Sequence, residues 1–486
     1  MKTLIQGGFV VGYDGEQHVI YENGCIAYEN EFIIFVGFPD DPQCPKCDFS
    51  IDAPESIISP GFINLHCIAN IDLQPNYLDT NTQINRSKKW FDSNTNIMSR
   101  KEYDLSARYS VASIIKGGST TFCAVTAMAT KKYENSLYES QSLVDNAIDF
   151  GVRGYIANNF QDISYYRSGE RKVFKHDKIL GEIAFKKAIK FSKSIIKKNN
   201  SLINTFLFPY TTETCTNELL KKSFRASKDL GIPLRTHFAQ YKSEIEHTYK
   251  NFKKTPLERL KYLNILDQNL TLTHCIYLNS DFKKEKFTRE QLNILSETET
   301  NICHCPVVYL RKGFGLNSYQ LLVNSDINVG IGTDTVPPDI ISEMQATSLL
   351  SKLKDDDSIS GNPKDIYNSA TIGGAKALNR KDIGRLQKGA LADIVIINIS
   401  NIRTGLVDDP IRSLVYYSNS KDIKTVIING KTVLDNYKIN SLDENDLYSS
   451  AQYLWNKLIS KKLLNVNKSS SNNSFKNIRN KYKKNI

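Results

Sequence analysis

The sequence predicts an α/β protein in which a (β/α)8 TIM-like barrel carries a small composite β-sandwich domain. Three observations support this prediction: strand-like runs alternate with longer helix-like stretches through the middle of the chain, eight such runs can be counted, and β-rich segments flank the middle at both ends. Strands that alternate with helices are typical of a parallel sheet. Eight repeats favour a closed barrel over a doubly wound open sheet. With 486 residues, 40% of them hydrophobic, the chain is long enough for a large domain and an accessory one.

The two ends of the chain are predicted to build one β-sandwich. Residues 1–58 consist of short alternating pieces separated by Gly, Asp and Asn, as in a meander of antiparallel strands. Residues 381–440 contain a matching β-rich texture, with Asn429-Gly430 as a hairpin turn. The predicted barrel occupies residues 59–380. A C-terminal helix is expected at 441–464 and a basic, disordered tail at 465–486.

The eight predicted barrel strands are separated by amphipathic helical patterns. One such pattern covers residues 182–197, and another covers 218–230 and is followed by Gly231, a residue that helices prefer just beyond their ends. The runs assigned to strands are 62–67, 120–125, 153–158, 205–209, 233–238, 270–275, 300–305 and 328–334.

Charge and composition exclude several classes of protein. No apolar run approaches the roughly 18–20 residues that span a bilayer, and the N-terminus lacks the pattern of a signal peptide, so we expect a cytoplasmic protein. The nine Cys have no disulfide-like spacing, and the single Cys44–Cys47 pair is interpreted as a surface loop rather than a zinc ribbon. The net charge is +11, but nine Lys or Arg follow residue 446 with no acidic residue, so the body carries only +2. Nucleic acid is therefore not an expected partner, apart from weak contact through the tail.

Four of the seven His lie at the ends of predicted strands, and an Asp ends the eighth. They are His66, His237, His274 and His304, with Asp334. In a (β/α)8 barrel the carboxyl ends of the strands surround one mouth, where active sites form. Imidazole and carboxylate are ligands of zinc, and a catalytic zinc needs about three protein ligands. The pattern therefore predicts a metal site that activates water, with Asp as the group that accepts its proton.

Several motifs give the sequence a family resemblance. They are Ser59-Pro60-Gly61-Phe62-Ile63-Asn64-Leu65-His66, Thr236-His237-Phe238-Ala239-Gln240, Leu272-Thr273-His274-Cys275, His304-Cys305-Pro306, Gly332-Thr333-Asp334-Thr335, and the run from Gly384-Arg385-Leu386 to Ala392-Asp393. Together they resemble the amidohydrolase superfamily, and within it the triazine-hydrolase and cytosine/guanine-deaminase-like branch. The resemblance extends from about residue 1 to about residue 440.

The resemblance implies a function and a set of roles. It implies a hydrolase of carbon–nitrogen bonds in small, often N-heterocyclic molecules, with one divalent metal ion, zinc before iron or manganese, and a homodimer. His66, His237 and Asp334 match the metal ligands, while His274 matches the residue that ligates metal or holds the water. Asp334, His274 and Gln240 are thus the candidate catalytic residues. The candidate substrate-binding residues are His304, Gln240, Arg311 and Thr335.

Two positions depart from the family pattern. Ile68 stands where the second His of the HxH motif is expected, and Ile cannot ligate a metal. Gln240 stands where deaminase-type members carry a proton-donating Glu, and an amide has no such proton at neutral pH. These departures favour a substrate that needs no ring protonation, and they leave open a second function, a catalytically impaired homologue that acts as a binding protein. The polar segment 74–100 is either a lid over the mouth or a plain surface excursion.

Overall fold

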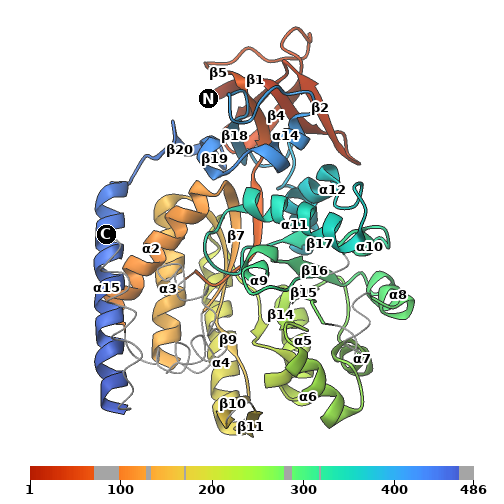
Figure 1. Ribbon diagram of the computed structural model, residues 1–486. Helices are drawn as coiled ribbons and strands as arrows, with labels where there is room; N and C mark the ends of the chain where they lie inside the picture. The colour runs from red at the N-terminus through yellow and green to blue at the C-terminus, as the bar shows by residue number, and fades with distance from the viewer. Residues whose placement is uncertain (70–97, 127–132, 169–170, 278–286, 317–318, 470–486) are drawn as a thin grey trace, which may run out of the picture.

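The computed structural model of the protein describes residues 1–69, 98–126, 133–168, 171–277, 287–316 and 319–469. A β-domain lies at one end of the molecule, and the parallel strands with their helices form the larger part (Figure 1). The predicted lid over 74–100 lies almost wholly outside the described residues. The predicted disordered tail over 465–486 begins too early, because α15 (Glu444–Ser469) continues to residue 469, and residues 470–486 lie outside the described residues.

The two ends of the chain share one nine-stranded sheet. Its order is β21-β20-β19-β18-β5-β1-β3-β4, and β2 pairs with β1. The first part and the last part of the chain meet where β18 pairs antiparallel with β5, from Ile394 opposite Pro60 to Asn398 opposite Ser56. The strands are β1 Lys2–Tyr13, β2 His18–Glu22, β3 Cys25–Glu29, β4 Phe32–Gly37, β5 Phe49–Pro60, β18 Ile394–Asn398, β19 Ile423–Ile428, β20 Lys431–Asp435 and β21 Lys438–Ile439.

Two four-stranded parallel sheets follow, in the orders β12-β8-β7-β6 and β14-β15-β16-β17. Isolated parallel bridges connect their edges, from Cys67 to Asp334 at one side and from Leu207 to Leu234 at the other. Their members are β6 Phe62–Cys67, β7 Ser119–Val125, β8 Arg153–Ala157, β12 Ile203–Asn204, β14 Leu234–Phe238, β15 Leu270–His274, β16 Asn301–His304 and β17 Val329–Ile331.

The fourth predicted strand differs from the structure. Instead of one run over 205–209, the chain forms β12 and a second short strand, β13 (Phe208–Pro209), which pairs with β9 (Asn159–Phe160). Between them the backbone of Leu207 changes partners, donating to Pro233 and accepting from Arg235, both at 3.0 Å. The ladder is therefore interrupted where the strand turns from one neighbour to the other. A further hairpin, β10 (Ile163–Ser168) with β11 (Arg171–His176), extends from this side of the molecule.

Helices connect the strands, and local sequence signals set their ends. The predicted helix over 218–230 is α5, which begins after the N-cap Thr216 and ends at Gly231 in the left-handed conformation, φ 64°. The helices are α2 Arg100–Lys116, α3 Tyr133–Phe150, α4 Lys178–Lys198, α5 Asn217–Leu230, α6 Lys242–Phe252, α7 Pro256–Tyr262, α8 Arg289–Glu297, α9 Pro306–Leu310, α10 Tyr319–Val323, α11 Ile340–Asp355, α12 Pro363–Asn368, α13 Gly374–Ala377, α14 Pro410–Tyr417 and α15 Glu444–Ser469.

The last helix, α15, packs along α2 (Figure 1). Its buried residues Ala451, Leu454 and Leu458 contact Leu105 and Tyr109 of α2. Ion pairs support the contact at both ends, from Lys116 to Glu444 at 3.0 Å and from Lys457 to Glu102 at 2.8 Å. None of the described helices is long and apolar enough to cross a membrane.

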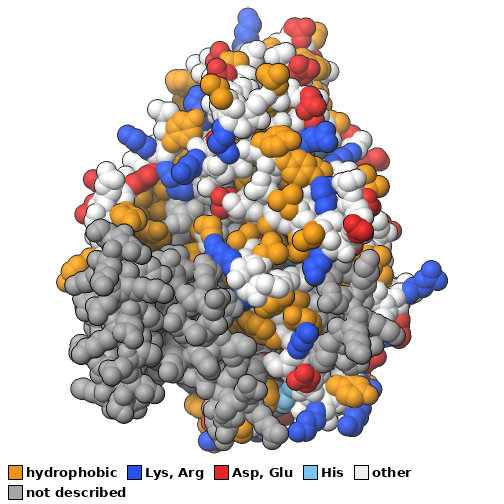
Figure 2. All heavy atoms as spheres, in the orientation of Figure 1, with side chains coloured by type: hydrophobic (Ala, Val, Ile, Leu, Met, Phe, Trp, Pro, Cys, Tyr) orange, Lys and Arg blue, Asp and Glu red, His pale blue; other side chains and the backbone are white. Residues whose placement is uncertain are grey.

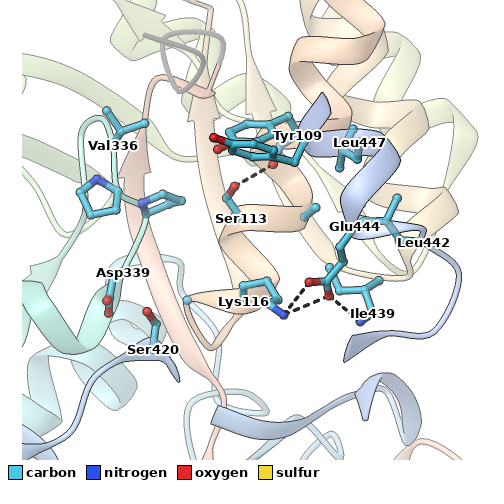
Figure 3. Close-up of a pocket in the computed structure, with 15 residues that line it drawn as sticks. Tyr109, Ser113, Lys116, Val336, Asp339, Ser420, Ile439, Leu442, Glu444 and Leu447 are labelled. Atoms are coloured by element: carbon cyan, nitrogen blue, oxygen red, sulfur yellow. Dashed lines mark hydrogen bonds and ion pairs between the residues drawn. The ribbon is translucent and has the colours of Figure 1, made fainter. Parts of the chain in front are cut away.

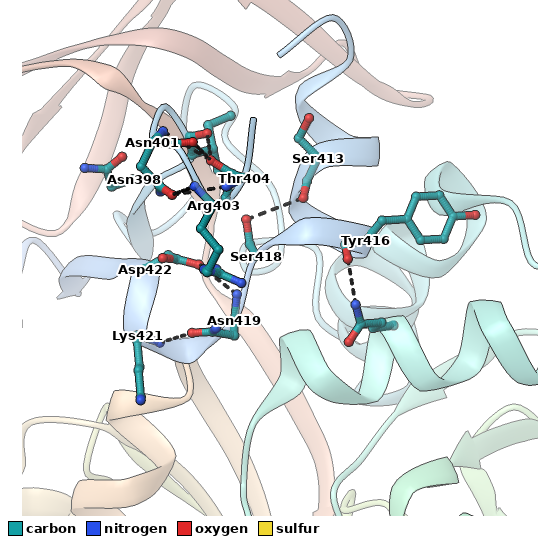
Figure 4. Close-up of polar contacts among 12 residues, drawn as sticks. Asn398, Asn401, Arg403, Thr404, Ser413, Tyr416, Ser418, Asn419, Lys421 and Asp422 are labelled. Carbon is teal, nitrogen blue, oxygen red and sulfur yellow. Dashed lines mark hydrogen bonds and ion pairs between the residues drawn. The ribbon is translucent and has the colours of Figure 1, made fainter. Parts of the chain in front are cut away.

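The connection from β18 to β19 is held by local hydrogen bonds (Figure 4). Asn401 accepts hydrogen bonds from the backbone of Arg403 and Thr404, and the Arg403 side chain pairs with Asp422. Gln345 of α11 donates to the Tyr416 carbonyl of α14 at 2.6 Å. This segment therefore ties the β-domain to α11, the helix that follows the loop after β17.

The interior separates into distinct apolar clusters. A large cluster lies between the strands and the helices, and a smaller one that includes Ile63, Leu65, Cys123 and Cys303 lies on the inner face of the parallel strands. Over the face drawn in Figure 2, Lys and Arg side chains are interspersed with Asp and Glu, without one extended patch of a single sign among the described residues.

Candidate metal centre

Four buried side chains meet at the carboxyl ends of the parallel strands. His66 comes from β6, His237 from β14 and His274 from β15, while Asp334 follows β17. One ligand atom of each lies within 4.8 Å of the others, and all four residues are buried. Residues more than 260 positions apart in the sequence are thus brought together by the parallel arrangement of the strands, as the sequence predicts.

Short distances join the imidazole rings. His66 Nε2 lies 3.2 Å from His237 Nε2 and 3.4 Å from Asp334 Oδ1, and the rings of His237 and His274 stack with centroids 5.3 Å apart. His237 Nδ1 lies 2.9 Å from the Tyr210 carbonyl, an acceptor to which it donates. That hydrogen bond leaves the Nε2 lone pair free for a metal, the usual arrangement of a ligating His.

Backbone hydrogen bonds hold Asp334 against His66. The amides of Thr333 and Asp334 both donate to the His66 carbonyl at 2.9 Å, and the Ile68 amide donates to the Asp334 carbonyl at 2.7 Å. Asn64 adds a side-chain clamp, donating to the Thr333 hydroxyl at 2.9 Å and accepting from the Thr333 amide at 3.2 Å. The first and last parallel strands are therefore fixed to each other at the very residues that carry the candidate ligands.

The backbone at the strand ends adopts the left-handed conformation, which residues other than glycine rarely take. Positive φ angles occur at Ala239 (49°), His274 (86°), Cys275 (52°) and Asp334 (57°). Each costs on the order of 1 kcal/mol and persists only where surrounding packing imposes it. Such backbone strain clusters at functional sites, and here two of the four candidate ligands carry it themselves.

The surroundings keep the three imidazoles neutral. Burial lowers the pKa of His237 to about 3, with a further contribution from His66. Burial also lowers the pKa values of His66 and His274 well below their usual range, and the guanidinium of Arg235 adds to the effect on His66. At neutral pH the ring nitrogens therefore carry lone pairs rather than extra protons, which is the state that binds a metal.

The cluster contains polar atoms that the described part of the protein does not satisfy. His66 Nδ1, both nitrogens of His274 and Asp334 Oδ1 are buried and have no hydrogen-bond partner among the described residues. Buried polar atoms are normally paired because an unpaired one costs roughly 1–3 kcal/mol. Three neutral imidazoles and a carboxylate suit a divalent cation such as zinc, so the donor set fits the predicted metal.

The remaining predicted site residues lie at different places. The Gln240 side chain donates to the Tyr309 hydroxyl. Thr335 is buried, and its Oγ1 has no partner among the described residues. Arg311 donates to the Val336 carbonyl at 2.6 Å, on the loop that follows Asp334. His304 does not join the four-residue cluster, and its ring lies against Tyr319, with centroids 6.1 Å apart. The substrate-binding roles of these four residues stay predictions.

The two departures from the family pattern have clear structural positions. Ile68 packs in the inner apolar cluster, on the same side as His66, so the structure has an apolar side chain where the motif would supply a second His. Cys67, between them, packs in the outer cluster with the helices, as alternation along a strand predicts. Ile68 is therefore not a member of the cluster, whose fourth residue is His274.

Three further residues matter at this site, and the sequence reasoning missed them. Tyr309 is buried, with its ring centroid 4.9 Å from that of His274. Glu244 is buried and accepts hydrogen bonds from the Gln240 amide at 3.1 Å and from Thr212. Burial, followed by the neighbouring Glu213, raises the pKa of Glu244 to about 7. Arg235 is fully buried, with its guanidinium 5.0 Å from the Phe206 ring.

Sequence spacing offered a signal for only some of them. Arg235 precedes His237 by two positions, so strand alternation places both on one face. Glu244 follows Gln240 by four positions, but the chain passes from a loop into α6 between them, and their spacing alone did not indicate contact. Tyr309 lies on the short helix α9, and nothing in the apolar run around it distinguished it from a core residue.

A separate cavity of about 410 Å³ lies away from this cluster (Figure 3). It is lined by α2, by the loop from Val336 to Asp339, and by the start of α15, with Lys116 and Glu444 paired at one side. None of the four clustered residues lines it. The cavity is therefore not the metal centre, although its wall includes the loop that follows Asp334.

Comparison with known proteins agrees with the site. The sequence pattern of the amidohydrolase family matches residues 57–433. Among curated proteins, 5-methylthioadenosine/S-adenosylhomocysteine deaminase of Pyrococcus horikoshii is 25% identical over 448 residues, which cover 91% of this chain and 97% of that protein. The enzyme of the same name from Pelotomaculum thermopropionicum is 26% identical over 456 residues, 93% of this chain and 97% of that protein.

Solved structures share the fold. An adenosine deaminase from Xanthomonas campestris with bound zinc has a TM-score of 0.81 at 20% identity, covering 94% of this chain and 98% of that one. Atrazine chlorohydrolase from Arthrobacter aurescens, complexed with zinc, has a TM-score of 0.77 at 19% identity, covering 93% and 100%. The family match spans most of the chain and includes all four clustered residues. The resemblance inferred from the motifs is thus confirmed, and the protein belongs to the amidohydrolase family of hydrolases that act on carbon–nitrogen bonds other than peptide bonds.

Proposed function

We propose that the protein is a zinc-dependent deaminase of an aminopurine nucleoside, with 5′-methylthioadenosine as the first substrate to test. The observation that carries this proposal is the convergence of His66, His237, His274 and Asp334 on one buried point. The names of the curated relatives support the substrate class, and the zinc of the solved relatives supports the metal. Iron and manganese are the alternative metals.

The chemistry would divide between the metal and the chain. Bound zinc supplies a Lewis acid that lowers the pKa of water toward neutrality. His66, His237 and Asp334 would hold it, with His274 as a fourth ligand or as the residue that holds the attacking water. Asp334 offers a carboxylate oxygen that can accept the water's proton and deliver it to the leaving nitrogen. Burial of the whole cluster excludes bulk water and strengthens these interactions.

Gln240 favours a second candidate within the same family. A ring nitrogen that must be protonated finds no carboxylic acid at this position, because Gln cannot donate a proton as Glu does. Hydrolysis of an amide or imine outside an aromatic ring needs no such proton. The other alternative, a binding protein with a decayed site, has less support, since the four polar residues remain together although Ile68 has replaced one family ligand.

Metal analysis together with an ammonia-release assay tests the proposal. Protein purified without chelators should contain close to one zinc per chain and release ammonia from 5′-methylthioadenosine. Asp334→Asn should lose both, because it removes a ligand and the proton acceptor. The matched control is His304→Asn, a buried strand-end His outside the cluster, which should keep its zinc. A metal-free wild type that gains zinc only on Ile68→His would contradict the enzyme and support the decayed binding protein.

Three finer features belong to the same proposal. The bridges at Cys67 and Leu207 support closure of the eight parallel strands into a barrel. The pairing of β5 with β18 supports a composite domain with boundaries near residues 58 and 381. The homodimer rests on family resemblance alone, and light scattering at several concentrations would test it.

A further inference from the structure

We propose that Tyr309 is the hydrogen-bond donor that faces the bound molecule at the metal centre, and that Gln240 positions it. This proposal rests on the proposed function in one respect, because it requires a metal at the four-residue cluster. In deaminases of the family, a Glu at the position of Gln240 is the donor to the bound molecule. The proposal gives that role to the hydroxyl of Tyr309, on α9.

The position of the phenol ring carries the first step. Tyr309 is 1% exposed, and its ring lies edge-on to His274, with centroids 4.9 Å apart. Its hydroxyl accepts the hydrogen bond of Gln240, which comes from the loop after β14, the strand that carries His237. A buried phenol normally finds a partner for its hydroxyl. Here the ring lies against the candidate ligand His274, and the hydroxyl is bonded to a residue that follows the candidate ligand His237 by three positions.

The hydrogen bond from Gln240 carries the second step. The Gln240 Nε2–H group donates to the Tyr309 oxygen, and no other hydrogen bond to this oxygen is found within the described parts of the chain. Because the amide is the donor, the phenol keeps its own proton for another acceptor. A Glu at position 240 would instead accept that proton. The replacement of Glu by Gln is therefore consistent with a change of donor rather than with loss of the site.

Packing fixes both partners. The Val307 amide at the start of α9 donates to the buried Glu343 carboxylate at 3.0 Å, which anchors the helix that carries Tyr309. The Gln240 amide donates to the buried Glu244 carboxylate at 3.1 Å, which anchors the loop after β14. Lys312 lies over the Tyr309 ring at 4.9 Å. Two independently anchored segments thus converge on one hydrogen bond, the preorganisation that a donor in an active site requires.

The test measures binding of acetohydroxamate, a small chelator whose oxygens bind zinc, by calorimetry on zinc-loaded protein. Tyr309→Phe removes only the hydroxyl and should weaken binding about tenfold, the effect of one hydrogen bond to a charged oxygen. Gln240→Met should weaken it by a smaller factor, about threefold, because the hydroxyl loses its orientation. In the double variant, the second change should add nothing, since Gln240 acts through Tyr309.

Controls separate this role from packing and from the identity of the substrate. Tyr319→Phe removes another buried hydroxyl of the same region, bonded to Ser369 at 2.9 Å, and should leave binding unchanged. All variants should keep the zinc content of the wild type. Unchanged binding in Tyr309→Phe, or additive losses in the double variant, would overturn the proposal. If zinc-loaded wild type binds acetohydroxamate but does not deaminate 5′-methylthioadenosine, the substrate assignment fails. The comparison of the two single variants with the double variant still decides the role of Tyr309.

Discussion

At the scale of single residues, burial explains most of the chemistry of this protein. The candidate ligands His237 and His274 are neutral imidazoles chiefly because burial lowers their pKa values. Other histidines experience the same burial without forming a metal site. His18 Nδ1 donates to the Gly12 carbonyl at 3.3 Å, and its Nε2 lies 3.0 Å from the Thr371 hydroxyl. Burial lowers the pKa of His18 to about 4.

This environment predicts a pH-dependent stability that does not involve the metal centre. Below pH 6.5 the unfolded chain binds a proton on His18, whereas the folded chain binds it only below about pH 4, so the free energy of unfolding falls as the pH is lowered through this window. The protonation of His18 thus lowers the free energy of unfolding by about 3 kcal/mol between pH 7 and pH 4, and His18→Gln removes this pH dependence. The difference in stability between wild type and variant should therefore narrow from pH 7 to pH 4 in urea titrations.

A constant gap between His18→Gln and wild type across the pH range would mean that His18 is not held neutral in the folded protein.

The sequence could predict the part of the site that consists of His and Asp residues at the ends of strands. His66, His237, His274 and Asp334 were found because chemistry-bearing residues recur at the ends of apolar runs. His304 shares that pattern but faces Tyr319, because a position at the end of a strand does not determine which side the residue faces. Tyr309 and Glu244 come from helices and loops, and their contacts depend on how these elements pack.

At the scale of elements, the contact between β17 and β6 controls the geometry of the candidate metal centre. Gly332 follows β17, and a Cβ added there would lie 2.6 Å from the His66 amide nitrogen and 2.9 Å from Cys303 Sγ. Backbone cannot move aside as a flexible side chain can. The absence of a side chain at this position is thus what lets the two strands exchange the hydrogen bonds that hold Asp334 beside His66.

A methyl group at this contact should separate the ligands. Gly332→Ala is expected to lower the free energy of unfolding by about 1–3 kcal/mol through overpacking and to reduce zinc content sharply. The matched control is Gly330→Ala on the same strand, where the closest atom is the end of the Leu65 side chain at 2.6 Å and can rotate away. Zinc analysis and thermal unfolding of the two variants measure the effect. Equal zinc content in both would show that the close approach is not needed for the ligand geometry.

The strands themselves were largely predictable, because a buried parallel strand is a short continuous apolar run. The exception, residues 203–209, shows the limit of such reasoning. The apolar pattern continues through Leu207, but hydrogen bonding passes there from one neighbouring strand to another and splits the run into β12 and β13. Partner exchange depends on tertiary geometry, which periodicity does not record.

At the scale of the whole molecule, a buried ion pair joins the β-domain to the parallel strands. Arg153, the first residue of β8, pairs with Asp393 just before β18, and both side chains are at most 1% exposed. Arg153 also donates to Asn429 at the predicted hairpin turn, and the Asn429 amide donates to Asp393 at 3.0 Å. Arg153, Asp393 and Asn429 are thus joined by an ion pair and two hydrogen bonds between the parallel strands and the nine-stranded sheet.

Removal of one partner should therefore be costly. Asp393→Asn is expected to lower the free energy of unfolding by about 3–5 kcal/mol, because it leaves the Arg153 guanidinium buried without a counter-charge. Asp149→Asn makes the same chemical change in an exposed pair, where the Arg108 and Asp149 side chains are 31% and 56% exposed, and should cost less than about 1 kcal/mol. Chemical denaturation of both variants gives the comparison. Similar losses in the two would contradict a special role for the buried pair.

The pairing of β5 with β18 has a consequence for biosynthesis. Roughly 330 residues separate the end of β5 from the start of its partner. At translation rates of about 5–20 residues per second, the nascent chain carries an unmatched strand edge for roughly 15 to 65 seconds before the complementary segment emerges from the ribosome. An open edge of this kind invites association with other chains. The beginning of the newly made polypeptide is therefore exposed to such association until its end has been synthesised.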